Sequence, residues 1–360
     1  MKVKIGEITS IRTGKLDANA ASPDGAYQFF TCSREPLRIS TYSYDCECVL
    51  VAGNGDLNVK YYNGKFDAYQ RTYIIEDNST GRLYMPYLYF FMLGYIEELR
   101  KQAIGGVIKY IKLGNLTEAL IELPTIEEQK KIVQILKSAR YVIEKEARQI
   151  ECLDELIKAR FIELFGTETE MGRWETTNVG DVADVCVGVV IKPSQYYCTD
   201  GIPAFRSLNI GKMQVKDSDW VFFTPEGHQK NQKSVIREND VLVVRSGAPG
   251  TACVATEKYD GFNAIDIIIA HPDTSRVNSV FLAMFTNMPH GMNQIQEKTG
   301  GAAQQHFNVG GYKSLRMILP PMAMQEQFAV FVEQTDKSKV IDINIILKGG
   351  VYNGNEFFVS

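Results

Sequence analysis

The sequence Leu123-Pro124-Thr125-Ile126-Glu127-Glu128-Gln129 leads into residues 126–165, a segment that contains neither glycine nor proline. The segment is rich in Glu, Lys, Ile, Leu, Ala and Arg, most of which favour helix. One helix over 126–165 would be about 60 Å long at about 1.5 Å per residue. Because it contains no breaker, we predict a spacer helix that stands clear of the domains beside it.

Apolar residues recur every seven positions along this helix: Leu136, Ile143, Ile150, Ile157 and Leu164. A heptad of this kind is typical of a coiled-coil seam. The alternative interpretation is an amphipathic helix that lies on its own domain.

The motif that opens the helix occurs twice. Leu319-Pro320-Pro321-Met322-Ala323-Met324-Gln325 repeats it 196 positions later. Other landmarks recur in the same order: Lys4–Ile8 with Gly14 and Asn178–Val182 with Gly188, Phe66-Asp67-Ala68 and Phe262-Asn263-Ala264, Gly105-Gly106 and Gly300-Gly301. The sequence therefore predicts two related globular halves.

Each half contains short apolar stretches rich in Val, Ile, Tyr and Phe, bounded by Gly, Asn, Asp and Pro, as strands are. Residues 85–99 and 280–296 have a helical pattern instead. Long crossover helices between successive strands are scarce. We therefore predict an α+β fold with two mixed, mainly antiparallel α/β domains.

The second spacer is expected to be short. Residues 322–340 keep a helical pattern, but 341–347 alternate with period two and Gly349-Gly350 follow, which predicts a hairpin or a loose tail. The expected divisions are domain 1 at 1–125, the long helix at 126–165, domain 2 at 166–321, the short second helix at 322–340 and a divergent tail at 341–360.

Composition excludes several classes of protein. The formal charge is -4, with 43 acidic and 39 basic residues, so no large basic field is available to hold nucleic acid. The seven cysteines form an odd set, and no signal peptide is visible at the start, so we expect a cytoplasmic protein. The apolar stretches are too short or too interrupted for a membrane span of about 20 residues.

Motifs for catalysis are missing. Asn63-Gly64-Lys65-Phe66 lacks the other residues of a phosphate-binding loop, the four histidines are scattered, and no nucleophile elbow or methyltransferase motif is present. Cys46 and Cys48 with Cys32 are more typical of packing than of a zinc site. We therefore predict a non-enzymatic protein with no metal site.

The duplicated unit, each copy followed by Leu-Pro-x-x-x-x-Gln and a helix, resembles the DNA-specificity (S) subunit of type I restriction-modification systems. The motif stands at Leu123–Val133 and, in degenerate form, at Leu319–Phe328. The segment Lys298–Gln304, with 315–321 behind it, is similar to the end of that family's target-recognition domains.

The resemblance implies a function. Each target-recognition domain would read one half of a split sequence in double-stranded DNA, and the two helices would pack as an antiparallel coiled coil that sets the spacing. Two methyltransferase subunits would dock on the helical regions, and restriction-translocase subunits would join through the complex. S-adenosylmethionine, Mg²⁺ and ATP would belong to those partners, with no cofactor on this chain.

Amide and guanidinium side chains suit base edges, so those near turns are candidates for DNA contact, with an ordinary loop role as the alternative for each. The first domain offers Asn54, Asn58, Gln70, Arg71, Lys109 and Tyr110. The second offers Arg206, Asn209, Arg245, Ser246, Gln304, Gln305 and His306. The glycine-rich stretch Lys298-Thr299-Gly300-Gly301 is suited to a phosphate.

Charged residues on the long helix are candidates for methyltransferase docking: Glu127, Lys130, Lys131 and Arg140. Because no segment is strongly basic, we expect the methyltransferase to supply much of the affinity for DNA. The competing hypotheses are a coiled-coil scaffold that does not bind DNA and a self-sufficient nuclease, although no convincing acidic metal site supports the latter.

Overall fold

The computed structural model describes residues 2–299 and 306–353. The chain divides into two compact units, one formed by Met1–Arg148 with the chain from Asp342, the other by Gln149–Ile341. Each unit contains one copy of the repeat and a large apolar core of its own. The predicted α+β fold with two mixed domains is confirmed.

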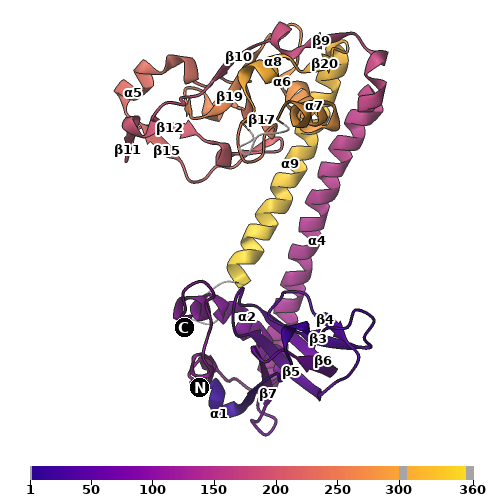
Figure 1. Ribbon diagram of the computed structural model, residues 1–360, viewed down its shortest axis with the longest axis vertical. Helices are drawn as coiled ribbons and strands as arrows, with labels where there is room; N and C mark the ends of the chain where they lie inside the picture. Colours follow the sequence, from indigo (N-terminus) through magenta and orange to yellow (C-terminus); the bar gives the residue numbers. More distant parts are fainter. Residues whose placement is uncertain (1, 300–305, 354–360) are drawn as a thin grey trace. The chain divides into compact units, whose positions relative to one another are not determined.

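The first unit is built on a six-stranded sheet in the order β2-β7-β5-β6-β3-β4 (Figure 1). Its strands are β2 (Thr9–Thr13), β3 (Tyr27–Phe30), β4 (Leu37–Ile39), β5 (Tyr44–Ala52), β6 (Val59–Ala68) and β7 (Thr72–Asp77). Neighbouring strands are antiparallel except β3 and β6, which run parallel. Helix α2 (Met85–Gln102) packs Leu88 and Met92 into one core with Val49 and Ile75 of the sheet.

A two-stranded sheet completes the first unit, where β1 (Lys2–Lys4) pairs antiparallel with β8 (Leu120–Glu122). Short helices α1 (Ile5–Ile8) and α3 (Leu113–Thr117) lie between these strands in the chain, as does the 3-10 turn η1 (Ala18–Ala20). A Cβ on Gly6 of α1 would come within 2.8 Å of the Thr117 Cβ. The contact between α1 and α3 therefore requires glycine at this position.

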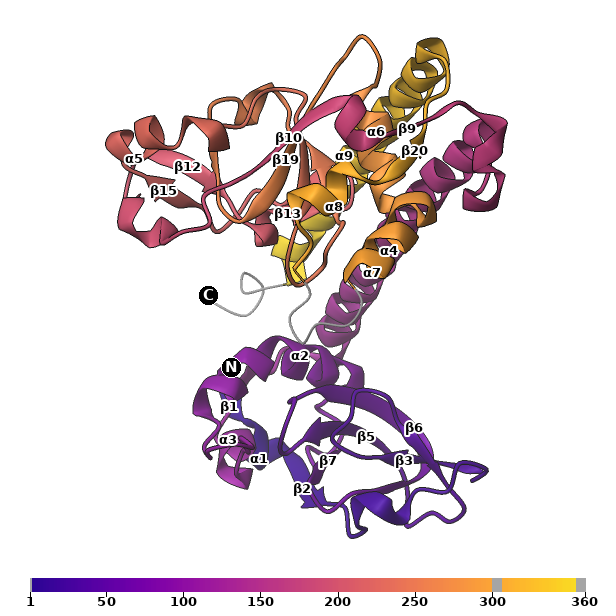
Figure 2. The same cartoon turned by 45° about the horizontal axis from the view of Figure 1, so that its top comes forward.

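The second unit contains two four-stranded sheets, β10-β19-β16-β17 and β11-β15-β12-β18, and two strand pairs, β13-β14 and β9-β20 (Figure 2). The strands are β9 (Thr176–Asn178), β10 (Ala183–Val187), β11 (Tyr197–Cys198), β12 (Ile202–Phe205), β13 (Ile210–Gly211), β14 (Gln214–Val215), β15 (Val221–Phe223), β16 (Val241–Val244), β17 (Ala252–Val254), β18 (Asn263–Ala264), β19 (Ile267–Pro272) and β20 (Arg316–Ile318). The helices besides the long ones are α5 (Pro225–Lys230), α6 (Ser279–Asn287), α7 (Pro289–Thr299) and α8 (Val309–Lys313). The 3-10 turns are η2 (Glu168–Arg173), η3 (Val179–Asp181), η4 (Pro193–Tyr196), η5 (Ser207–Asn209), η6 (Gln232–Ser234) and η7 (Glu257–Tyr259).

The repeat predicted from the sequence is confirmed in the sheets. The order β10-β19-β16-β17 reproduces β2-β7-β5-β6. The repeated stretches also pair alike, because Asp67 lies opposite Phe29 and Asn263 opposite Ala204, both in parallel ladders. The pairs β1-β8 and β9-β20 complete the correspondence, with both pairs antiparallel.

Two glycines of the repeat occupy the same tight position. A Cβ on Gly14 would lie 2.1 Å from the Ala68 carbonyl oxygen, and one on Gly188 would lie 2.5 Å from that of Ala264. Since real Cβ atoms do not approach so closely, each glycine permits its strand to cross close to the neighbouring backbone. The spacing of these glycines in the sequence therefore reflects a shared packing contact.

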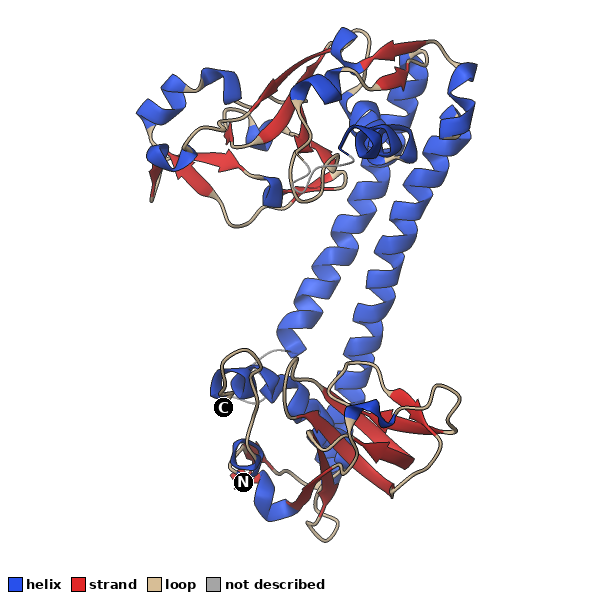
Figure 3. Cartoon of the chain, in the orientation of Figure 1, coloured by secondary structure: helices blue, strands red, loops and turns tan. Residues whose placement is uncertain are grey.

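Helix α4 (Ile126–Phe165) has the predicted bounds and is unbroken (Figure 3). Thr125 and Glu128 form a capping box, in which the Thr125 N–H donates to Glu128 Oε2 at 2.9 Å and the Glu128 N–H to Thr125 Oγ1 at 3.3 Å. At the other end, Gly166 has a φ of 87° and its N–H donates to the Ile162 carbonyl. Threonine and glycine thus fix where the helix begins and ends.

The second long helix is longer than predicted, because α9 spans Met322–Asn353. The predicted end near Val340 is wrong, and so is a hairpin over 341–347. The backbone continues because a formed helix gains residues at little cost and this stretch contains no proline. Alternation of apolar residues was a weaker signal than continuity with a helix already in place.

In the second unit the end of α4 and the start of α9 pack side by side. Phe161 and Phe165 both contact Phe328, with ring centroids 5.4 and 5.8 Å apart. Asp154 forms an ion pair with Lys339 at 2.7 Å. Since earlier residues of α4 meet later residues of α9, the two helices are antiparallel over this stretch.

The predicted seam residues differ in burial. Leu136 and Ile157 are buried, Leu164 packs against the second core, and Ile143 and Ile150 are half-buried. Between Leu136 and Ile157 no residue of α4 is buried. The two ends of the helix therefore pack on the cores of their own units, whereas the prediction had the spacer clear of both domains. Within the described ranges, every helix is too short or too polar to cross a membrane.

Candidate nucleic-acid interface

Backbone hydrogen bonds gather most of the first-domain candidates at one end of the six-stranded sheet. The Gly53 N–H donates to the Arg71 carbonyl at 2.7 Å, and the Gly55 N–H to the Lys109 carbonyl at 2.9 Å. Asn54 lies between these glycines, where β5 ends. The exposed residues Arg71 and Lys109 are therefore hydrogen-bonded through their backbones to the two glycines that flank Asn54.

Tyr110 belongs to the same end of the sheet, since it forms a β-bridge with Asn54 and is 37% exposed. Gln70 is exposed next to Arg71. Among the residues that the structure describes, the Arg71 and Lys109 side chains have no hydrogen bond and no ion pair. Two cations, two amides and a phenol are therefore available to a ligand at this site.

Asn58 is less available. Its amide nitrogen donates to the carbonyls of Cys32 and Asp56, both at 2.8 Å, and its oxygen accepts a bond from Lys60. These bonds commit both ends of the side chain to holding the turn before β6. Its predicted contact with DNA finds no free donor here.

Residues 104–110 form an exposed apolar loop that was not predicted. The backbones of Ile104 and Tyr110 exchange hydrogen bonds of 3.0 and 2.8 Å, and Gly105 has a φ of 118°. At the tip, Val107 is 104% and Ile108 62% exposed. The signal in the sequence is two glycines followed by two β-branched residues.

The second domain places Arg245, Ser246 and His306 at the equivalent end of the sheet. The Phe307 N–H donates to the Arg245 carbonyl at 3.0 Å, as the Ile111 N–H donates to Gly53 at 2.9 Å. Ser246 follows Arg245 as Asn54 follows Gly53. The Ser246 hydroxyl is 2.7 Å from Nδ1 of the exposed His306, whereas Asn54 and Tyr110 are joined by a β-bridge of their backbones.

Arg245 is locked inside this site. Its guanidinium donates to Asp266 at 2.6 Å and to the Phe307 carbonyl at 3.0 Å, and the side chain is 15% exposed. Ser246 and His306 are therefore the more accessible members of the group.

Asn209 is a wrong prediction. It is fully buried; its oxygen accepts the Arg206 N–H at 2.9 Å and its nitrogen donates to the Ser218 carbonyl at 2.7 Å. Arg206 donates to the Asp219 carbonyl, and its Nε is buried without a partner in the described part of the chain. These polar side chains organise the loop between β12 and β15.

The glycine-rich segment is only partly described. Lys298 is exposed near the end of α7. Thr299 is 7% exposed and its hydroxyl donates to the Ile295 carbonyl at 2.9 Å, so this hydroxyl is already bonded within the helix. The remaining candidates lie outside the described residues: Gly300, Gly301, Gln304 and Gln305.

The docking candidates on α4 are all exposed: Glu127, Lys130, Lys131 and Arg140. Lys130 Nζ lies 6.0 Å from the centroid of the Tyr84 ring. Arg140 donates to Glu144 at 2.8 Å and to the Tyr89 hydroxyl at 2.9 Å. The hydrogen bond to Glu144, followed by that to Tyr89, raises the pKa of Arg140.

No set of three His, Cys, Asp or Glu side chains in the described ranges is placed to hold a metal ion. The described site contains planar amides, cations and hydroxyls at two equivalent sheet ends. Groups of this kind bind phosphates and read base edges.

Known proteins resemble this chain in sequence and in fold. Residues 1–153 match the family model described as the type I restriction modification DNA specificity domain. The chain is similar to the type I restriction enzyme EcoDI specificity subunit of Escherichia coli, with 38% identity over 156 residues, 43% of this chain and 34% of that protein. It is also similar to the EcoBI specificity subunit of Escherichia coli, with 21% identity over 277 residues, 69% of this chain and 58% of that protein. The matched region thus spans about a third to three fifths of the length of these relatives.

The fold is similar to the crystal structure of the S subunit of a type I restriction-modification system from M. genitalium. The TM-score is 0.62 at 15% identity, and the match covers 98% of this chain and 93% of the other. That likeness extends the sequence match of the first repeat to the fold of both repeats. By sequence over the first repeat and by fold over both, the chain is similar to type I restriction-modification specificity subunits.

Proposed function

We propose that this chain is the DNA-recognition subunit of a type I restriction-modification complex. Each domain reads one half of a bipartite target in double-stranded DNA. The long helices set the distance between the half-sites and dock two methyltransferase subunits, and restriction-translocase subunits join through the complex. The chain is non-catalytic in this proposal, and S-adenosylmethionine, Mg²⁺ and ATP act on the partners.

The observation that supports the proposal is the equivalence of the two sheet ends. The same backbone hydrogen bond joins Gly53 to Ile111 in the first repeat and Arg245 to Phe307 in the second. The side chains at the two positions differ, with the half-buried Asn54 and exposed Tyr110 in one and the half-buried Ser246 and exposed His306 in the other. One scaffold with two sets of polar side chains suits the reading of two different half-sites.

Charge supports a role for partners in DNA affinity. The chain has a formal charge of -4, and the cations Arg34 and Arg100 near the first sheet end are paired with Asp56 at 2.8 and 3.3 Å. A protein that neutralises few phosphates binds DNA weakly and with a shallow dependence on salt. The methyltransferase subunits then provide much of the electrostatic contact.

The decisive experiment expresses the chain with its methyltransferase in a host that lacks other modification systems and maps methylated bases across the genome. The expected result is one motif with two specific halves separated by a fixed unspecified gap. Methylation at a single continuous motif, or none while a complex forms, would contradict the proposal.

A parallel binding assay separates the scaffold hypothesis. Mobility shifts with the mapped duplex should show tight binding by the complex and much weaker binding by this chain alone. A scaffold protein would assemble with the methyltransferase without changing its DNA specificity. Nanomolar specific binding by the isolated chain would overturn the view that partners supply the affinity.

A further inference from the structure

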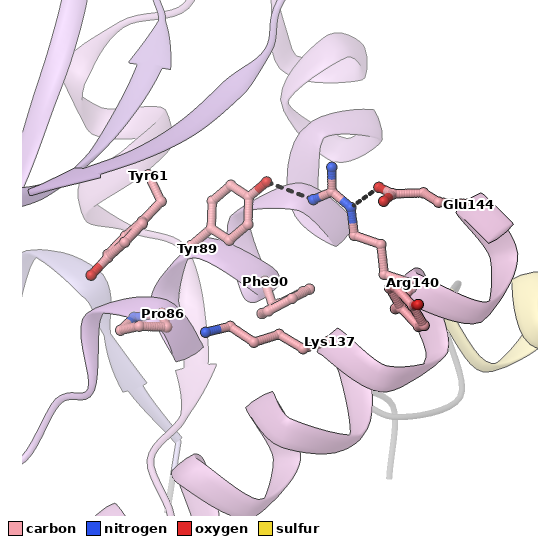
Figure 4. Close-up of a pocket in the computed structure, with 8 residues that line it drawn as sticks. Tyr61, Pro86, Tyr89, Phe90, Lys137, Arg140 and Glu144 are labelled. Carbon is pink, nitrogen blue, oxygen red and sulfur yellow. Dashed lines mark hydrogen bonds and ion pairs between the residues drawn. The ribbon is translucent and has the colours of Figure 1, made fainter.

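A pocket of about 200 Å³ lies in the first unit between the sheet, α2 and α4 (Figure 4). Tyr61 of β6 and Tyr89 and Phe90 of α2 supply aromatic walls, and Lys137 and Arg140 of α4 supply cations. Figure 4 shows the Lys137 side chain extending along the pocket. Glu144 of α4 also lines the pocket and pairs with Arg140, so Lys137 carries the unpaired positive charge on the helical side of this small aromatic pocket.

The two cations differ in availability. Arg140 is held by Tyr89 and Glu144, whereas Lys137 has no hydrogen bond or ion pair within the described residues. Tyr61 donates to Glu47 at 2.6 Å, outside the pocket's cationic side. Lys137 is therefore the group that can accept an anionic partner without breaking an internal bond.

The second unit has a larger groove of about 750 Å³ at the start of α9. Its lining includes apolar side chains, among them Val254 of β17, Val280 of α6 and Val330 of α9. Val330 is 51% exposed. An aliphatic partner side chain would therefore bury surface that water now covers.

The rim of this groove is acidic. Four carboxylates line it, against the single cation Lys337: Glu238, Glu326, Glu333 and Asp336. Glu333 pairs with Lys337 at 2.7 Å, and Asp336 pairs with Lys339. In the described part of the chain, the carboxylates of Glu238 and Glu326 have no such partner.

The pocket and the groove occupy equivalent positions in the two repeats. The backbone N–H that begins α2, at Tyr84, and the one that begins α6, at Asn278, each donate to the buried glutamine of the following motif. This aligns Pro86 with Val280, which line the pocket and the groove respectively. The sheet agrees, because Tyr61 lies opposite Val49 in β5 as Val254 lies opposite Val241 in β16.

With the glutamines aligned, positions 196 residues apart correspond, and the charges invert. In this alignment, three cations of α4 correspond to three anions of α9: Lys130 to Glu326, Lys137 to Glu333 and Arg140 to Asp336. Positions separated by three, seven and ten residues lie on one face of a helix. One docking face is therefore positive in the first repeat and negative in the second.

We propose that the two repeats dock their methyltransferase partners unequally, the first through a carboxylate-bearing segment at Lys137 and the second through a lysine- or arginine-bearing segment at Glu326 and Glu333. The inference rests on the proposed function. A partner surface that complements one face meets like charge at the other, and like charges across an interface oppose binding. Two copies of one methyltransferase cannot then bind both repeats through identical contacts with equal affinity.

The test titrates the full chain with its methyltransferase and measures stepwise dissociation constants by calorimetry and copy number by native mass spectrometry. The wild type should bind two copies in two distinguishable steps. Lys130→Glu with Lys137→Glu should weaken one step roughly tenfold and leave the other, and Glu326→Lys with Glu333→Lys should weaken only the second. Raising the salt concentration should reduce the difference between the two wild-type dissociation constants and the effect of each charge reversal, because salt screens charge.

Controls separate charge from folding. Lys145→Glu reverses an exposed cation of the same helix outside the pocket and should change neither step. Lys137→Gln keeps the stem without the charge and should cost less than Lys137→Glu. Equal wild-type steps, or charge reversals that leave both steps unchanged in folded protein, would overturn the inference. Failure of the wild type to bind any methyltransferase would instead overturn the proposed function.

Discussion

Gln129 and Gln325 make the same three hydrogen bonds in the two repeats. Both side chains are fully buried. The Gln129 oxygen accepts the Tyr84 N–H at 2.8 Å, and its nitrogen donates to the carbonyls of Arg82 at 2.8 Å and Pro124 at 2.9 Å. The side chain thus joins the start of α2 to Pro124, which lies just before the start of α4.

In the second repeat the Gln325 oxygen accepts the Asn278 N–H at 2.9 Å, and its nitrogen donates to the carbonyls of Arg276 at 3.3 Å and Pro320 at 2.8 Å. One carboxamide satisfies one backbone donor and two backbone acceptors. Glutamine is the long side chain that carries an acceptor and two donors without charge. This explains the last residue of the Leu-Pro-x-x-x-x-Gln motif.

We expect Gln325→Leu to destabilise the second unit by about 3 kcal/mol, because it removes a fully buried carboxamide and leaves the Asn278 N–H and the carbonyls of Arg276 and Pro320 without this partner. Both tryptophans, Trp174 and Trp220, belong to this unit, so tryptophan fluorescence during urea unfolding reports on it. Gln327→Leu, at an exposed position two residues along α9, is the matched control and should change stability by less than about 0.5 kcal/mol. Equal effects of the two changes would contradict this role for Gln325.

The sequence predicted those parts of the fold that the local spacing of residues determines. The repeat, the bounds of α4 and the pairing of Phe66-Asp67-Ala68 follow from local spacing. The end of α9 did not, since residues 341–347 alternate like a strand but extend a helix already formed. The heptad likewise omitted Phe161 and Phe165, because aromatic rings at a helix end pack on a domain core as well as on the other helix.

The candidate site was predicted less well than the fold. Proximity to turns found Asn54, Arg71 and Tyr110, which do come together. It could not separate them from Asn209, whose amide is consumed by the loop around it, because composition does not reveal which hydrogen bonds close internally. The docking role proposed for Lys137 depends on its correspondence with Glu333 in the other repeat, which the residue type alone does not reveal.

A second prediction concerns pH. His271 Nδ1 lies 2.6 Å from the buried Asp240 carboxylate, and this hydrogen bond, followed by that to Cys186, raises the pKa of His271 to about 9. An unfolded histidine titrates near 6.5. The added stability is therefore complete below about pH 6.5 and is lost as pH rises through 9. We expect the free energy of unfolding to fall by about 2 kcal/mol between pH 7 and 9.5.

His271→Gln provides the comparison, because glutamine is neutral throughout this range. The difference in unfolding free energy between wild type and His271→Gln, followed by tryptophan fluorescence, should shrink over the same interval. Subtracting the variant removes the contribution of lysines and tyrosines that also titrate at high pH. A difference that stays constant from pH 6 to 9.5 would show that the imidazole is not charged in the folded protein.

A third prediction tests the helix pair of the second unit. Phe161 is fully buried and contacts Phe165, Phe281 and Phe328. Phe161→Ala should destabilise the unit by about 4 kcal/mol, from lost burial and the cavity left behind. Leu156→Ala, on the same helix but 49% exposed, should change the urea midpoint little. A midpoint shift no larger than that of the control would contradict a packing role for this ring.

The fourth prediction follows from the equivalence of the two sheet ends. If each end reads its own half-site, Arg71→Ala should relax the sequence preference in one half of the methylated motif and Ser246→Ala in the other. A lost bidentate base contact costs about 1–3 kcal/mol of discrimination, which methylation mapping detects as new bases accepted at one position. A lost phosphate contact instead weakens binding at every sequence alike and lowers the salt dependence.

The matched control for this prediction is Lys145→Ala, which removes an exposed cation of α4 that belongs to neither set of candidate residues. It should leave both halves of the motif unchanged. The separation of effects is the informative result, because a general loss of folding or assembly would reduce methylation at every site and leave the motif intact. Relaxation of the same half by Arg71→Ala and Ser246→Ala would contradict the assignment of one half-site to each repeat.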